Sequence, residues 1–599
     1  MTYDLNPHRF HIPVMGIAFT IDTPIKVASY GITSALSIIE DNLIEMMRKH
    51  YYQQNEETYV PIEKHEDNYR VRRITDYLNL VNRNVQMRFE KIKESAFERG
   101  SEIVKYFEML PEESGLKQKY HQFLQAQGEA KAELEALLRK HMRPGGIEVN
   151  IMTKVDKNNL DSKGEILPDG SDALGALKAY AESDLENSAV IFSAGMNPRL
   201  FNYLEHFRDF DALGWGIFRK KVIIKVSDYR SALIQGKYLA KKGIWVSEFR
   251  IESGLNCGGH AFATQGYLLG PILEEFRSKK EELAQELYSL YDPAIRAKGA
   301  AGFDKPHPVN ITVQGGIGTA AEQQLLYGYY GVNGTGWGTP FLLCPEATTV
   351  DENTLELLSK SKEKDVVLSK ASPLGVRFNY LRNTTAHQER QARIEKGKPG
   401  SPCTEKYLVS NTEFTKEPIC TASRKYQKLK LEQLKDAGLP EEEYQLQVED
   451  LLSKECLCIG LSNAAALNYK VPVVKKLDAV TICPGPNIAN FSKIASLQEM
   501  TDHIYGRQEL PQSASRPHMF IKELELYVDY LKEEIKNTFN PNARDIKGWG
   551  GFCNNLLEGV SHYRKLAEQE LIKQKTTFEN ALYRLESAVR DIQKNLSVE

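Results

Sequence analysis

A glycine-rich segment that ends in a histidine, Gly254 to His260 (GLNCGGH), is the part of the chain with the clearest chemical potential. It follows an apolar run, Gly243 to Phe249, that predicts a buried strand. Two further strand-plus-glycine segments come later, Val309 to Gly318 and Gly331 to Phe341. Glycines at strand ends let backbone N–H groups approach an anion closely. The three segments therefore predict a phosphate-bearing cofactor at the mouth of a parallel barrel.

Phosphate ligands are expected at the ends of the last two strands. A phosphate dianion needs several convergent donors, which strand ends and a following helix N-terminus supply in many barrels. The predicted cofactor-binding residues of this kind are Gly316, Gly318, Gly338 and Thr339, with Gly259 earlier in the chain. The alternative is that these glycines only form tight turns between a strand and the next helix.

Three polar side chains complete the candidate site. His260 is the candidate catalytic acid or base, because imidazole titrates near neutral pH; alternatively it caps the next helix. Lys225 ends an apolar strand and could stabilise negative charge on the cofactor, or else form a surface salt bridge. Asn150 could hydrogen-bond the cofactor's polar edge, or instead form a turn or cap.

The elements that would position these residues alternate between strand and helix. Alternation of this kind predicts right-handed parallel crossovers, and eight units fit a closed (β/α)8 barrel, or TIM barrel. An open doubly wound sheet is the alternative. The eight strand-like segments are His11 to Phe19, Ile32 to Ile39, and those that begin at Gly146, Ser188, Lys221, Gly243, Val309 and Gly331.

Two mostly helical additions flank the barrel sequence. The barrel is assigned to residues 1–40 and 146–380, and residues 41–145 form a large helical insertion after the second strand, because apolar residues recur there at helical spacing. Residues 381–599 form a mostly helical C-terminal region, with one long helix from about Asn555 to Asn595 that packs on the barrel or on another subunit. Connections after strands cross the active-site face, so the insertion is expected to cover the cofactor, with a subunit contact or external packing as alternatives.

Composition limits the class of protein. The chain has 599 residues, 41% of them hydrophobic and 26% charged, with a net charge of −3, which is typical of a globular protein. The sequence has no basic stripe of the kind that predicts nucleic-acid binding. It also has no apolar run long enough to span a membrane. The N-terminus lacks a signal-peptide pattern, and the cysteines are scattered, so we expect a cytoplasmic protein.

The cysteines are expected to be ordinary core residues rather than ligands. Cys257 is expected to fill a small buried space. A later group raises the question of zinc or an iron–sulfur cluster, but its spacings match no standard motif, so no metal is predicted. That group consists of Cys403, Cys420, Cys456, Cys458 and Cys483.

The motifs, taken in order, resemble those of the nitronate monooxygenase family (2-nitropropane dioxygenases), which are FMN-dependent barrels. The opening IPVMGIAFTIDTPIKVASYGITSALSI resembles the family's first strand, Thr-Pro helix and second strand. Further segments of the chain resemble later strand ends of the family. They are Gly146 to Asn150, Ile223 to Ser227, Gly254 to His260, Gly315 to Gly318 and Gly338 to Phe341. The resemblance covers residues 11–40 and 146–380. Asn256 and Cys257 depart from it, since the family usually has Glu-Ala there.

The resemblance implies an FMN-dependent oxidoreductase that oxidises a small nitronate or similar carbanion-type substrate with O2. It implies that Asn150 contacts the flavin and that His260 abstracts the α-proton of a nitroalkane or faces the bound nitronate. Flavin-dependent enoyl reductases share much of the glycine pattern, so an NAD(P)H-dependent enzyme of that kind is one alternative. A non-catalytic barrel scaffold is another. The expected partners are a small-molecule substrate, O2 or NAD(P)H, and a second copy of the chain through the helical additions.

Overall fold

The centre of the protein is a closed barrel of parallel strands. The computed structural model describes residues 7–153, 156–160, 165–193, 195–258, 265–471, 477–513 and 515–596. The barrel strands are β1 (Phe10–Ile12), β2 (Thr33–Ser37), β3 (Ile147–Ile151), β6 (Ser188–Phe192), β9 (Lys220–Val226), β10 (Val246–Glu252), β11 (Asn310–Gln314) and β12 (Gly334–Gly336). Each strand pairs in parallel with its neighbour in chain order, and β12 closes the ring against β1. The predicted (β/α)8 barrel is confirmed, and the open sheet is excluded.

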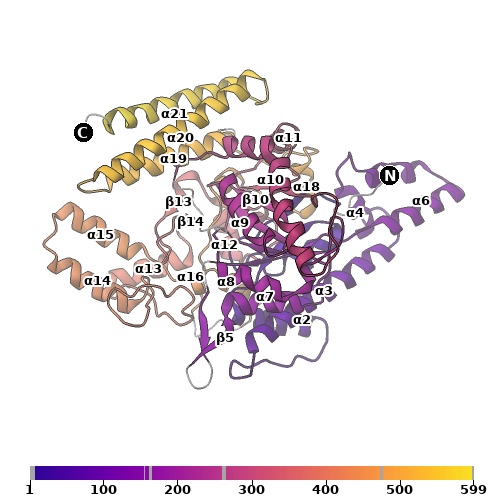
Figure 1. Ribbon diagram of the computed structural model, residues 1–599, viewed down its shortest axis with the longest axis horizontal. Helices are drawn as coiled ribbons and strands as arrows, with labels where there is room; N and C mark the ends of the chain where they lie inside the picture. The colour runs from indigo at the N-terminus through magenta and orange to yellow at the C-terminus, as the bar shows by residue number, and fades with distance from the viewer. Residues whose placement is uncertain are drawn as a thin grey trace.

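Helices between the strands surround the barrel (Figure 1). Local sequence explains where two of them begin: α1 has proline in its first turn, and Thr319 with Glu322 forms a capping box at the start of α11. The helices that follow barrel strands are α1 (Thr23–Val27), α7 (Asp172–Glu182), α8 (Pro198–Tyr203), α9 (Tyr229–Ala240), α10 (Leu269–Ala297), α11 (Ala320–Gly328) and α12 (Glu352–Lys360). Two short hairpins, β4 (Asn158–Leu160) with β5 (Ile166–Ser171) and β7 (Ala212–Gly214) with β8 (Ile217–Phe218), were not predicted.

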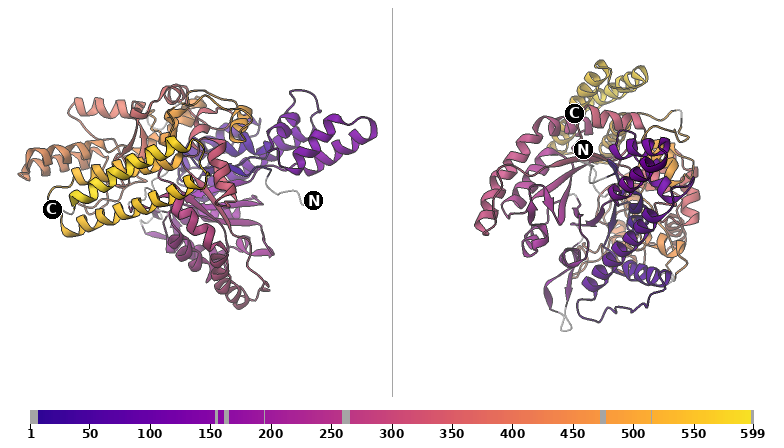
Figure 2. Two further views of the ribbon diagram at one scale, coloured as in Figure 1. Left: turned by 90° about the horizontal axis from the view of Figure 1, so that it is seen from above. Right: turned by 90° about the vertical axis from the view of Figure 1, so that its right-hand side faces the viewer.

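The insertion after β2 is helical, as predicted. It consists of α2 (Asp41–Gln54), α3 (Tyr69–Glu94), α4 (Glu102–Met109), α5 (Gly115–Gln125) and α6 (Gly128–His141). Helix α3 packs beside α1 and α7 and so joins the ring around the barrel. The C-terminal end of α3 packs with helices α4 to α6 around a separate small core, which includes Phe89, Phe107 and Leu138. This lobe projects on the side opposite the C-terminal helices (Figures 1 and 2).

Between the last barrel helix and the C-terminal region lies a hairpin that the sequence did not indicate, β13 (Val366–Ser369) with β14 (Phe378–Leu381). Helices dominate after it, as predicted. They are α13 (Thr385–Glu395), α14 (Arg424–Asp436), α15 (Glu441–Ser453), α16 (Leu457–Gly460), α17 (Asn463–Asn468), α18 (Leu497–Ile504), α19 (Met519–Lys536), α20 (Ala543–Glu568) and α21 (Lys575–Leu596). The pair α14–α15 extends away from the barrel around a small core of Tyr426, Leu434 and Leu451 (Figure 1).

The prediction of one long final helix was wrong. The chain reverses between α20 and α21, where Glu570 and Gln574 both adopt φ of 58°, a left-handed conformation that ends a helix. The resulting hairpin packs on α19, and α20 also contacts α10 of the barrel (Figure 1). Packing of this region on the barrel is therefore confirmed.

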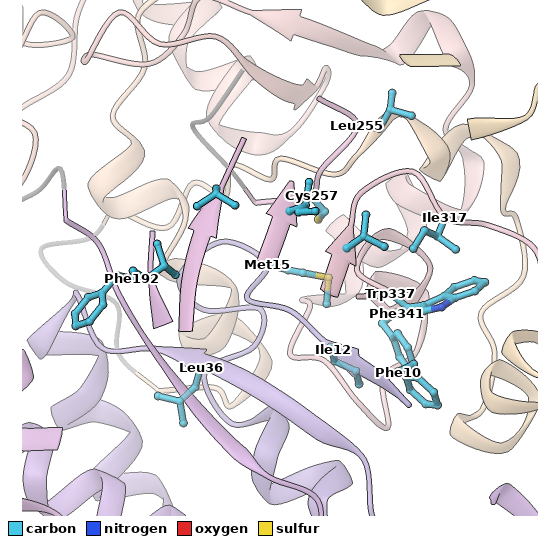
Figure 3. Close-up of a cluster of buried hydrophobic side chains, with 14 of the residues drawn as sticks. Phe10, Ile12, Met15, Leu36, Phe192, Leu255, Cys257, Ile317, Trp337 and Phe341 are labelled. Atoms are coloured by element: carbon cyan, nitrogen blue, oxygen red, sulfur yellow. The ribbon is translucent and has the colours of Figure 1, made fainter. Parts of the chain in front are cut away.

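Large apolar side chains fill the space around the strands. Figure 3 shows Met15 and Cys257, from separate loops, directed into the same part of this core as Trp337 and Phe341. Trp337 is fully buried, and its Nε1 donates to Gln323 Oε1 at 2.8 Å. No helix among the described residues is long and apolar enough to cross a membrane.

An ionic cluster occupies the N-terminal side of the barrel interior. Arg250 donates from Nη1 and Nη2 to the two carboxylate oxygens of Glu148, at 2.8 Å each. Its Nε donates to Glu248 Oε1 at 2.8 Å, and Thr312 donates to the same oxygen at 2.5 Å. Arg250 and Glu148 are buried, Glu248 is partly buried, and all three charges are paired, which is the condition under which a protein interior tolerates them.

Candidate functional site

A cavity lies at the C-terminal mouth of the barrel, where the active sites of (β/α)8 enzymes are found. Its empty volume is about 930 Å³, part of it open to solvent. The barrel supplies Val14, Gly16, Ile17, Ser37, Ile39, Asn150, Met152, Ser193, Lys225, Glu252 and Gly258 to its wall. The C-terminal region supplies Tyr407, Leu408, Leu457, Cys458, Leu461 and Cys483.

Lys225 belongs to a buried ion pair that faces this cavity. Its Nζ lies 2.9 Å from Glu252 Oε1, and the two side chains are 8% and 5% exposed. The same oxygen accepts hydrogen bonds from Asn256 Nδ2 at 2.6 Å and Gln314 Nε2 at 2.8 Å. The surface salt bridge considered for Lys225 is therefore excluded. Three donors on one carboxylate oxygen fix both the carboxylate and the ammonium beside the cavity.

Asn150 presents a buried acceptor to the same cavity. The residue is inside strand β3 and only 3% exposed, so it does not form a turn or cap. Its Oδ1 has no hydrogen-bond partner among the described residues. Leaving a buried acceptor unpaired costs about 1–3 kcal/mol. Asn150 Oδ1 is therefore available to a water molecule or to a ligand that offers an N–H or O–H group.

The predicted phosphate residues Gly316, Gly338 and Thr339 lie at the ends of the neighbouring strands β11 and β12, but they do not line the cavity. Other segments pack closely on them. A Cβ on Gly316, whose φ is +79°, would lie 2.5 Å from Leu255 Cδ1, and one on Gly338 would lie 3.3 Å from Cys257 Cβ. At least part of the need for glycine here is therefore steric, because the loop after β10 packs on both positions.

Hydrogen bonds within the chain already use some of the predicted phosphate donors. The N–H of Gly318 donates to Glu322 Oε2 at 2.9 Å, and Arg516 Nη2 lies 2.8 Å from the same oxygen. The hydroxyl oxygen of Thr339 accepts the N–H of Gly485 at 3.2 Å. Gly318 is therefore not a free phosphate donor here, and the hydroxyl of Thr339 is also directed toward the sulfur of Cys257.

The catalytic candidate His260 and the cofactor-binding candidate Gly259 lie outside the described residues. Gly258 is described, and it fixes the position of the segment before them. Its N–H donates to Cys483 O at 3.0 Å, and a Cβ there would lie 2.6 Å from Gly16 N. The loop after β10 is thus held between the loop after β1 and the C-terminal region, at the wall of the cavity.

Cys257 fills space, as predicted. Burial raises the pKa of its thiol, with a further contribution from nearby Cys483. Its Sγ donates to Cys483 O at 3.4 Å. A thiol in this setting stays protonated near neutral pH, so it packs the core and does not act as a nucleophile.

The cavity is covered by the C-terminal region rather than by the insertion. Tyr407 anchors this cover, since its hydroxyl donates to Glu40 Oε1 at 2.9 Å and to Asp41 Oδ1 at 3.0 Å, just after β2. Burial, together with the charge of Asp41, raises the pKa of Glu40 to about 7. The lining residues found in the described chain include none from 41–145, so the structure gives the lid prediction no support.

Sequence reasoning missed several residues of the site. Glu252 could have been found, because it ends the strand next to that of Lys225 and carboxylates compensate buried ammonium groups. Tyr407 and Cys483 carried no comparable signal for this cavity, since they come from irregular segments well beyond the last barrel strand, which ends at Gly336.

No protein-family model and no curated protein matches the chain. Among solved structures, the enoyl reductase domain of MlnA from the macrolactin biosynthesis cluster of Bacillus amyloliquefaciens is 13% identical; the match covers 68% of this chain and 87% of that chain, with a TM-score of 0.33. Nitroalkane oxidase from Streptomyces ansochromogenes is 12% identical, with 63% and 84% of the two chains covered and a TM-score of 0.28. Such values establish no function. The fold rests on the strand order of the barrel itself.

Proposed function

We propose that this protein is an FMN-dependent oxidoreductase, similar to nitronate monooxygenases, that oxidises a small nitronate or other carbanion-type substrate with O2. The observation that carries the proposal is that the unpaired Asn150 Oδ1 and the ammonium of Lys225 belong to residues that line one cavity, whose remaining wall is largely apolar. A donor and an acceptor in the wall of an otherwise apolar cavity suit a planar ring with one polar edge.

The polar groups of the cavity fit the flavin ring. The pyrimidine edge of a flavin alternates carbonyl oxygens with an N–H group, so Asn150 Oδ1 would accept from the N–H and Lys225 Nζ would donate to a carbonyl. Val14, Ile17 and Met152 offer apolar contacts to the ring. At the phosphate end, the backbone of Gly316 and Gly338 and the hydroxyl of Thr339 are the proposed donors, with Gly259.

Bound flavin would supply the electron acceptor. The chain would supply the surroundings of the reaction. Lys225 would stabilise negative charge that develops at the ring edge, since a preorganised cation in a water-poor site is effective there. Glu252, held by Asn256 and Gln314, would keep Lys225 Nζ in place. His260, two residues after the cavity-lining Gly258, would face the bound nitronate, or would take the α-proton where the substrate enters as a neutral nitroalkane.

The visible spectrum of the purified protein, followed by anaerobic mixing with an alkyl nitronate or with NADPH, tests the proposal. We expect flavin absorption that is bleached by the nitronate and not by NADPH. Bleaching by NADPH alone would instead assign the enoyl reductase type of reaction. A colourless protein that takes up no added FMN would overturn both and leave the scaffold interpretation.

A further inference from the structure

Four of the five cysteines between residues 403 and 483 come together at one small pocket beside the main cavity. Its empty volume is about 280 Å³. The cysteines that line it are Cys403, Cys420, Cys456 and Cys458. All four are free thiols, and Cys420 and Cys458 are buried. Cys483, the fifth member of the group, lines the main cavity instead. The sequence favoured scattered core cysteines, whereas folding places four thiols against one space.

Backbone pairing brings the two halves of this cluster together. Ser401 N donates to Ala422 O at 2.9 Å, and Arg424 N donates to Ser401 O at 3.1 Å, which sets Cys403 beside Cys420. Glu455 N donates to Ala371 O at 2.9 Å and fixes the start of the Cys456–Cys458 turn. The cluster is therefore assembled by ordered backbone from three separate parts of the chain.

A backbone N–H group near each of the four sulfurs also favours its thiolate form. These groups belong to Lys406 for Cys403, Ala422 for Cys420, Ile459 for Cys456 and Leu408 for Cys458. The turn that aims the first of these N–H groups requires Lys406 at φ of 59°, a conformation that is unusual for a residue with a side chain. Hydrogen bonds to sulfur of this kind orient and tune cysteine ligands in metal sites.

We propose that Cys403, Cys420, Cys456 and Cys458 bind a thiophilic metal centre, either one Zn²⁺ ion or an iron–sulfur cluster. Four cysteines form a complete ligand set for both, and each thiol gives its proton to solvent on binding. Among the described residues, no group of three or more His, Cys, Asp or Glu side chains is arranged to hold a metal ion in this structure. The thiols are paired instead, Cys403 with Cys420 and Cys456 with Cys458. Metal binding would close the two pairs around one centre.

The surrounding segment has a structural need for such a centre. Between α13, which ends at Glu395, and α14, which begins at Arg424, the chain forms isolated bridges but no helix or strand. Irregular segments longer than about 12–15 residues are uncommon in compact domains and are usually functional. A metal held by ligands at both ends of this segment and in α16 would order it, as metals do in regions with little core of their own.

A metal centre here would also support the main cavity. Leu457 and Cys458 line both pockets, so the thiol pocket and the cavity share one wall. Loss of the metal would therefore loosen the cover of the cavity as well as the segment itself. This inference does not depend on flavin binding, because metal content is measured separately from flavin content.

Metal analysis of the full chain, purified without chelators and under anaerobic conditions, tests the proposal. We expect one zinc ion per chain, or iron with an equivalent amount of acid-labile sulfide. Either result supports the site and tells the two centres apart. Cys420→Ser and Cys456→Ser should lose most of the metal, whereas Cys553→Ala, in α20 and away from the cluster, should keep it.

A second measurement avoids variants that fail to fold. Titration of the wild-type chain with a mercurial reagent should release the metal as the thiols react, and the metal-free chain should take up Co²⁺ with the absorption of a tetrahedral thiolate complex. The proposal is overturned if the folded chain holds no metal and takes up no Co²⁺, or if the four thiols are found as two disulfides. Equal metal content in Cys420→Ser and Cys553→Ala would also overturn it.

Discussion

The barrel interior contains two ionic clusters, and they differ in one respect that matters for function. On the N-terminal side, Arg250 is bound by Glu148 and Glu248 with every charge paired inside the protein. At the mouth, Lys225 is also paired, with Glu252, but Asn150 Oδ1 in the wall of the same cavity has no partner among the described residues. The charges of the first cluster need no ligand, whereas the wall of the cavity has an acceptor available to one.

Because of this difference, residues of one strand serve two roles, some in stability and others in ligand binding. Glu248, Arg250 and Glu252 are every second residue of β10. Glu248 and Arg250 belong to the ionic cluster on the N-terminal side, whereas Glu252 lines the cavity. Breaking the Arg250 cluster should lower the free energy of unfolding of the protein. Changing the polar groups at the cavity should instead lower the affinity of the protein for its ligand. The following variants test this division, from the largest expected effect to the smallest.

Arg250→Met should give the largest loss of stability. The substitution leaves Glu148 and Glu248 in the barrel without their cation, and breaking a buried pair in this way costs about 3–5 kcal/mol. Chemical denaturation followed by circular dichroism measures the change in unfolding free energy. A change below about 1 kcal/mol, the range of exposed ion pairs, would show that the closed cluster is not structural.

Acid should weaken the N-terminal side of the barrel through His11. Burial, with the charge of Arg250, lowers the pKa of His11 to about 3 from 6.5, so the unfolded chain takes up a proton first as pH falls. The unfolding free energy should therefore fall between pH 6.5 and pH 3.

His11→Asn isolates this contribution. The pH dependence of its unfolding free energy should be shallower than that of the wild type, by up to about 1.4 kcal/mol per pH unit for the one missing group. Other buried histidines, such as His8, titrate in both proteins and cancel in the comparison. Identical pH profiles would mean that His11 is not held neutral by the fold.

Lys225→Met should cost less stability than Arg250→Met but weaken FMN binding. Glu252 would keep its hydrogen bonds from Asn256 and Gln314, so we expect a loss of about 1.5–3 kcal/mol, the value of one hydrogen bond to a charged group. FMN affinity, measured by quenching of flavin fluorescence, should fall about tenfold or more. Lys221→Met, on the same strand but outside the cavity lining, is the matched control and should leave FMN affinity unchanged.

Asn150→Ala should change stability least. It removes a buried acceptor that forms no internal hydrogen bond through Oδ1, so we expect a change of less than about 1 kcal/mol in unfolding free energy. FMN affinity should still fall, by about fivefold to tenfold, because the ligand loses one hydrogen-bond partner. A large loss of stability with unchanged affinity would place Asn150 in the structural class.

The barrel was predictable from sequence, whereas its cover was not. Apolar strands and the Thr23-Pro24 helix start are local signals, and they gave the eight strands in order. The reversal between α20 and α21 was not predicted, because Glu570 and Gln574 adopt left-handed conformations there. Glycine and asparagine are the residues that usually adopt such conformations, so these two residues gave no signal of a turn. Lys225 and Asn150 were found because both stand at or near the end of an apolar strand.

The cover and the cysteine cluster depend on contacts between distant segments. Tyr407 reaches Glu40, and the cysteines meet only after the segment between α13 and α14 folds back on α16. Spacing along the chain carries no information about such contacts. The predicted phosphate donor Gly318 illustrates the reverse case, since its motif was recognised but its N–H group is used by Glu322.

Equilibrium titration of the 599-residue chain with FMN tests the central claim most directly, with Asn150→Ala and Lys221→Met measured in parallel. The account predicts that the wild type and Lys221→Met bind one FMN per chain with equal affinity, and that Asn150→Ala binds it more weakly at unchanged stability. It would be contradicted by a wild-type chain that binds no FMN, or by equal affinity in all three proteins.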